Sequence, residues 1–64
     1  MDLQTYLQNT ETTQKELGAR IGVSQGLVYQ WLTGRTRITA ERAIEIEKAT
    51  SGQVTRKELR PEIF

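Results

Sequence analysis

Two glycines four residues apart, Gly18 and Gly22, constrain the fold of this chain more than any other feature. They lie in the segment TQKELGARIGVSQGLVYQWLTG, residues 13–34, whose apolar spacing indicates two short helices joined by a tight turn. Glycine adopts the left-handed conformation that ends many helices, so Gly22 marks the predicted corner. A glycine inside a helix costs about 1 kcal/mol relative to alanine, and close approach of the second helix explains why Gly18 is tolerated. The segment therefore predicts a helix-turn-helix over about residues 14–33.

Caps and apolar spacing predict the remaining elements. A first helix is expected over about residues 3–8, and a fourth over roughly residues 40–49. Thr55 and Glu58 form a capping-box pair that predicts one further helical turn. No convincing β-strand alternation is present. The predicted fold class is all-α, a compact bundle of four to five helices, with residues 1–64 forming a single domain.

The predicted core consists of apolar residues that recur at helical spacing. They are Leu3, Tyr6, Leu7, Leu17, Ile21, Val23, Val28, Trp31, Leu32, Ile38, Ala43, Ile44 and Ile46. Trp31 could also stack on a nucleic-acid base, but its place among the apolar positions of the motif favours the core.

Size and composition exclude several classes of function. A chain of 64 residues is near the lower limit for a core that has no disulfide or metal to support it. It contains no cysteine and no histidine, and the one-turn spacing of Glu41 and Glu45 is more typical of a solvated helix face than of a catalytic pair. We therefore expect no enzyme activity, cofactor, metal or small-molecule substrate. No segment predicts a membrane span or a signal peptide, so a cytoplasmic protein is expected.

The charge of the chain is unevenly distributed. Its net charge is only +1, but residues 13–39 carry four basic residues against one acidic residue, a local net charge of +3. Residues 40–50 carry three acidic residues against two basic ones. In so short a chain a random surface can produce this asymmetry, so it supports nucleic-acid binding only together with a motif.

The stretch GVSQGLVYQWLTG resembles the phage repressor and Cro family, and it is especially similar to Cro-related and YdaS-type prophage regulators. The resemblance is strong over residues 13–34 and looser over the rest of the chain. It implies that residues 25–33 form the recognition helix, which lies in the major groove with its N-terminal residues facing base edges. It also implies that Gln14 bonds a phosphate and braces Gln25.

Four residues at this helix are candidates for contacts with bases. Gln25 and Gln30 can each make a two-point contact with the N6 and N7 atoms of adenine. Tyr29 has two interpretations, contact with a thymine methyl or a phosphate, or coverage of the core. Ser24 is a weaker candidate because its hydroxyl is also placed to cap the helix.

The phosphate candidates are a helix-terminal glutamine and the basic residues of the motif region: Gln14, Lys15, Arg20, Arg35 and Arg37. Arg35 and Arg37 directly follow the recognition helix, where the chain would pass the DNA backbone. Arg20 has the alternative of being simply solvated on the first motif helix.

These features predict a sequence-specific transcriptional regulator, a Cro-like prophage repressor that binds double-stranded DNA at a near-palindromic operator. The alternative is a prophage toxin or antitoxin-like protein that uses the same scaffold to bind another protein. A weak homodimer, strengthened on DNA, is expected. This chain lacks the C-terminal strand through which some Cro proteins dimerise. The expected surface consists of the apolar residues left over once the motif is packed, which are Val54, Leu59, Ile63 and Phe64, with part of the fourth helix. The other interpretation of Val54 and Leu59 is that they complete the monomer core.

Overall fold

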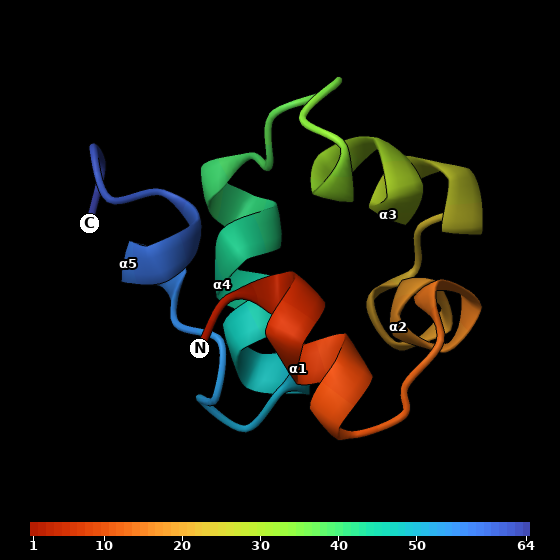
Figure 1. The fold of residues 1–64 in the computed structure, drawn as a ribbon. Helices are drawn as coiled ribbons and strands as arrows, with labels where there is room; N and C mark the ends of the chain where they lie inside the picture. The colour runs from red at the N-terminus through yellow and green to blue at the C-terminus, as the bar shows by residue number, and fades with distance from the viewer.

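The computed structural model describes residues 1–64 and contains five α-helices and no β-strand (Figure 1). The predicted all-α fold class is therefore confirmed. The helices are α1 (Leu3–Asn9), α2 (Gln14–Ile21), α3 (Gln25–Leu32), α4 (Ala40–Ala49) and α5 (Arg56–Leu59). None of the five has the length and apolar character that a membrane-spanning helix requires.

Every helix is preceded by an N-cap residue whose side chain accepts a hydrogen bond from the backbone amide three residues further on. The caps are Asp2, Thr13, Ser24, Thr39 and Thr55. At Thr13 and Thr55 the reciprocal glutamate bond is also present, which completes both predicted capping boxes. Each cap stabilises its helix by about 1 kcal/mol, and together they determine where these short helices begin.

One apolar core joins the helices. Its buried members are Leu3, Tyr6, Leu7, Leu17, Ile21, Val28, Trp31, Ile46 and Val54. α2 packs against both α3 and α4, and α5 packs on α4, on the side of the molecule away from α3 (Figure 1). Trp31 is only 8% exposed, so its predicted place in the core is confirmed.

Two sequence-based expectations about apolar residues are wrong. Ile44 was expected in the core, but it is half-buried and lies outside the core cluster, because Ala43 and Ile46 occupy the inward face of α4. Val54 was expected on a self-association surface, but it is completely buried, and Leu59 packs against the same core. The alternative that these two residues complete the monomer core is therefore correct.

A buried hydroxyl holds Val54 in place. Thr50 is 1% exposed, and its Oγ1 donates to the carbonyl oxygen of Ile46 at 2.9 Å. Oγ1 of Thr50 also accepts the backbone N–H of Val54 at 3.1 Å. Because an unpaired buried polar group is costly, this double use of one hydroxyl allows the chain after α4 to turn back into the core.

The corner between α2 and α3 has the backbone conformation predicted for it. Gly22 follows the last residue of α2 with φ 76° and ψ 30°, and no atom of a residue beyond its two chain neighbours lies within 4 Å of the position that a Cβ would occupy there. A side chain at this position therefore meets backbone strain and no steric clash.

We expect Gly22→Val to lower the thermal midpoint by roughly 10 °C, because a β-branched residue disfavours positive φ by about 1–2 kcal/mol. Circular dichroism melts would measure this change. Gly22→Asn is the matched control and should cost clearly less, because asparagine tolerates the left-handed region. Equal midpoints for the wild type and the valine variant would contradict the strain argument.

An ion pair ties α5 to α4. The carboxylate of Glu47 accepts hydrogen bonds from Arg56 through Nε at 2.8 Å and through the backbone N–H at 3.2 Å. These bonds, the side-chain bond first, lower the pKa of Glu47 below its ordinary value. A carboxyl group with a lower pKa in the folded chain stabilises the fold at pH values above its unfolded pKa, and this contribution is lost as the pH falls through the folded pKa.

We therefore expect Glu47→Gln to lower the thermal midpoint by a few degrees at pH 7 and to have a smaller effect at pH 3, because the stabilising contribution of the wild-type carboxylate decreases as the pH falls toward and through its lowered pKa. Melts of both proteins across this pH range would measure the difference. Glu11→Gln is a suitable control, since Glu11 is exposed and makes no ion pair. A Glu47→Gln effect of the same size at both pH values would contradict the assignment.

Candidate nucleic-acid interface

The junction of α2 and α3 is built by direct backbone contact at Gly18. A Cβ on this residue would lie 2.6 Å from the carbonyl oxygen of Val23 and 3.4 Å from the carbonyl carbon of Ser24. The carbonyl oxygen of Gly18 in turn accepts the backbone N–H of Val23 at 2.8 Å. The predicted reason for this glycine, close approach of the second helix, is confirmed.

α3 has two faces of opposite character. Val28 and Trp31 point into the core, and Leu27 and Leu32 are partly buried beside them. The remaining face is exposed and consists of Gln25, Gly26, Tyr29 and Gln30. Tyr29 is 49% exposed, so the interpretation that it covers the core is wrong. The chain thus presents two amide side chains and a phenol on the outer face of a helix whose inner face is packed into the core.

Two of the base-contact candidates, Ser24 and Gln30, already make a side-chain hydrogen bond within the chain, whereas Gln25 does not. Ser24 Oγ accepts the backbone N–H of Leu27 at 3.1 Å, so it caps α3 as expected. Gln30 Oε1 accepts a hydrogen bond from Thr36 Oγ1 at 2.8 Å. The side chain of Gln25 makes no hydrogen bond within the chain. Thr36 could not be predicted from the sequence, because no spacing rule relates a loop hydroxyl to a helix residue six positions earlier.

Gln14 is the first residue of α2 and is half-buried. It borders a shallow depression between α1 and α2 that is also bordered by Gln4 and Thr13. No hydrogen bond joins Gln14 to Gln25, so the brace implied by the family resemblance stays a prediction for a DNA complex. The N-terminal amides of α2 beside Gln14 suit a phosphate.

The basic residues fall into two groups according to their ion pairs. Arg42, Arg56 and Arg60 each pair with a glutamate: Glu45 at 3.0 Å, Glu47 at 2.8 Å, and Glu62. The other six basic residues make no ion pair and are exposed: the four phosphate candidates Lys15, Arg20, Arg35 and Arg37, and also Lys48 and Lys57. Their charges are thus available to an external anion, whereas those of the paired arginines are already compensated.

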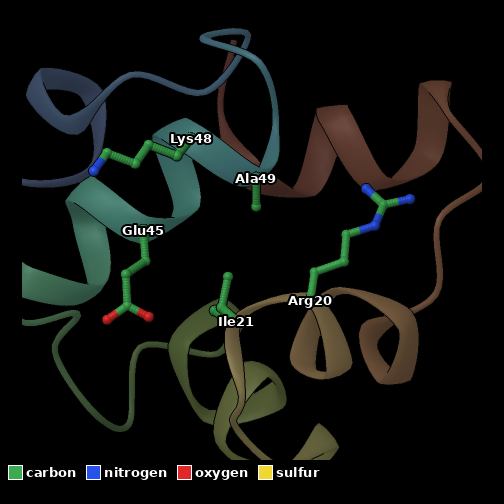
Figure 2. A pocket seen from close by; sticks show the side chains of 5 residues that line it. All are labelled: Arg20, Ile21, Glu45, Lys48 and Ala49. Carbon is green, nitrogen blue, oxygen red and sulfur yellow. The ribbon is translucent and has the colours of Figure 1, made fainter.

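Arg20 differs from the other three. Its side chain extends from α2 toward α1, where Nη1 donates to the hydroxyl of Tyr6 at 3.4 Å. Figure 2 shows it at the rim of an open depression that is also lined by Ile21 and by Glu45, Lys48 and Ala49 of α4. A phosphate contact by Arg20 would therefore lie beside α1, apart from the exposed face of α3.

Arg37 lies within electrostatic reach of the C-terminal residues. The guanidinium of Arg60, hydrogen-bonded to Glu62, lowers the pKa of that carboxyl below its ordinary value, and the charge of Arg37 lowers it further by a smaller amount. Arg60 Nη1 also donates to the carbonyl oxygen of Ile38 at 2.6 Å. The segment that follows α5 is thus held against the loop that carries the basic residues.

Comparisons with known proteins agree with the resemblance noted in the sequence. The family model for bacterial toxin YdaS matches residues 7–64. The chain is also 44% identical over 50 residues to the protein described as "Putative transcriptional regulator YdaS" of Escherichia coli (strain K12), an alignment that covers 78% of this chain and 51% of that protein. The chain thus spans about half the length of this curated relative, and no solved structure matches it. Because the family model covers nearly the whole chain, the chain belongs to the YdaS family.

Proposed function

We propose that this protein is a transcriptional regulator that binds double-stranded DNA sequence-specifically through α3. The single observation that carries the proposal is the division of α3 into a buried apolar face and an exposed face with Gln25, Tyr29 and Gln30. A helix that only packed would need neither the tight approach at Gly18 nor two exposed amides on its outer face. The description of the relative as a transcriptional regulator adds support.

In the proposed complex α3 lies in the major groove. Gln25 and Gln30 contact base edges, where a glutamine matches the donor and acceptor atoms of adenine. Lys15, Arg35 and Arg37 contact phosphates and set the orientation of the helix in the groove. One recognition helix contacts only a few base pairs, so we propose that two copies bind half-sites about one DNA turn apart, as in a Cro-like repressor.

Dimer formation is weak in this proposal. Ile63 is 50% exposed, and Ile44 and Phe64 are partly exposed, but no large apolar surface remains once Val54 and Leu59 are assigned to the core. Two such chains would therefore associate mainly on DNA, where the first copy orients the second. The proposal includes no catalytic step, cofactor or metal, and it places the protein in the cytoplasm with the DNA.

Selection from a randomised pool of DNA duplexes tests this function directly. The purified chain should enrich inverted repeats whose half-sites are about one helical turn apart. Gln25→Ala should lose the enrichment at one position of each half-site. Gln8→Ala removes an exposed glutamine from α1 and should leave the selected sequence unchanged. A recovered pool as random as the starting one would overturn the proposal.

The description of the matching family as a bacterial toxin favours a second function. In that case the same scaffold acts chiefly by binding another protein. Growth arrest on expression that persists in a Gln25→Ala, Gln30→Ala variant would favour this function, because those substitutions remove only the proposed base contacts. Growth arrest that disappears in this variant would instead connect the toxicity to DNA binding.

A further inference from the structure

The loop after α3 folds back on Gln30. Gly34, with φ 77°, reverses the chain, and the backbone amides of Arg35 and Thr36 then point at the carbonyl oxygen of Gln30, at 2.9 and 3.4 Å. The hydroxyl of Thr33 lies 3.3 Å from the same carbonyl oxygen. Two backbone hydrogen bonds and the Thr33 hydroxyl therefore hold the loop that carries Thr36 against Gln30.

From this position Thr36 also contacts the side chain of Gln30. Its Oγ1 donates to Oε1 at 2.8 Å, and both residues are exposed. An exposed glutamine amide otherwise rotates freely, because its last torsion has no strong preference. The hydroxyl uses one lone pair of Oε1, which leaves the second lone pair free and directs the NH2 group away from the loop.

We propose that Thr36 is a positioning residue that holds the Gln30 amide ready to contact adenine. The inference rests on the proposed DNA-binding function and extends it. With the hydroxyl bond in place, Oε1 can still accept from adenine N6, and Nε2 can donate to N7. Ordering the side chain before binding reduces the entropy lost in the complex, so the contact with the correct base gains affinity.

Base discrimination tests the inference. Binding is measured on the selected operator and on duplexes with single base-pair changes, at fixed salt. Thr36→Val, which keeps the shape of the side chain, should reduce discrimination at one position of each half-site by roughly threefold to tenfold. Thr36→Ser keeps the hydroxyl and should restore it. The salt dependence should not change, because no charge is removed.

A double-mutant cycle separates positioning from direct contact. In a Gln30→Ala background, Thr36→Val should have no further effect, because there is no amide left to position. If the loss persists undiminished in that background, or if it is equal on all duplexes, Thr36 acts on the DNA itself and the inference fails. If Gln30→Ala does not change discrimination at any position, the base contact assigned to Gln30 under the proposed function is the part that fails.

A measurement on the free chain tests the contact without DNA. The side-chain amide nitrogen of Gln30 should show restricted motion in nitrogen-15 relaxation experiments with the wild type and fast motion with Thr36→Val. Gln25, which has no such partner, provides an internal comparison for a mobile amide. Equal mobility of the Gln30 amide in both proteins would overturn the inference whatever the DNA experiments show. Thermal midpoints of the two proteins should agree, since Thr36 is exposed.

Discussion

Gly18→Val is expected to remove most of the chain's free energy of unfolding. The first side-chain carbon alone would lie 2.6 Å from the carbonyl oxygen of Val23, and this oxygen belongs to backbone that cannot rotate away. Overpacking of this kind costs about 1–3 kcal/mol, and more where the backbone has to move. A domain of this size rarely has more than about 3–5 kcal/mol of total stability. Far-UV circular dichroism and urea titration would measure the loss.

Ala19→Val is the control for this experiment. Ala19 is the next residue of α2 and is exposed, so valine there changes only the helix propensity, by at most about 0.7 kcal/mol. A Gly18→Val protein as stable as the Ala19→Val protein would show that α2 and α3 do not approach as closely as described. The position of α3 relative to α2 would then need revision.

Removing two charges with Arg35→Gln and Arg37→Gln is expected to weaken binding to all DNA sequences by a similar factor and to flatten its salt dependence. Each phosphate contact contributes about 0.9 to the slope of log affinity against log salt concentration. The double variant should therefore lose about 2 units of slope per subunit. Titration of a labelled duplex at several salt concentrations would measure both quantities.

The matched control removes the same amount of charge elsewhere. Lys48→Gln with Lys57→Gln changes two exposed residues on α4 and α5 and should change the slope only slightly. An equal loss of slope in both double variants would show that net charge, and not contact, determines the salt dependence. A variant at Arg35 and Arg37 that kept the slope and lost only operator preference would show that these arginines do not contact phosphates.

Most of the fold could be predicted because its signals are local. A cap and the residue it caps lie three positions apart, and the corner at Gly22 depends on one residue's backbone. The roles of Thr50 and Arg42 could not be predicted in this way. Thr50 is buried because the chain turns back after α4, and Arg42 donates from α4 to the carbonyl oxygen of Ile21 at the end of α2, 21 residues earlier. Such contacts depend on how the helices pack.

In the candidate site, too, features with local sequence signals could be predicted, and contacts that depend on packing could not. The exposed face of α3 follows from helical spacing, because Gln25, Tyr29 and Gln30 fall on the side of the helix away from Val28 and Trp31. Their assignment as base contacts came from the family resemblance and stays a prediction. Thr36 was missed because its contact with Gln30 requires the reversal at Gly34, and a glycine alone does not specify the direction of the chain that follows. The direction of Arg20 toward α1 also depends on packing between elements.

The uneven distribution of charge along the chain would affect how the molecule approaches a charged partner. Residues 13–39 carry a net charge of +3, residues 40–64 carry five charges of each sign, and residues 1–12 carry two acidic residues and no basic one. The excess of positive charge is therefore concentrated in the segment that contains α2 and α3. Under the proposed function, such an uneven charge distribution would turn the protein as it approaches DNA, so that more encounters would begin with α3 facing the DNA. Association with DNA would then be faster than the net charge of +1 alone would make it.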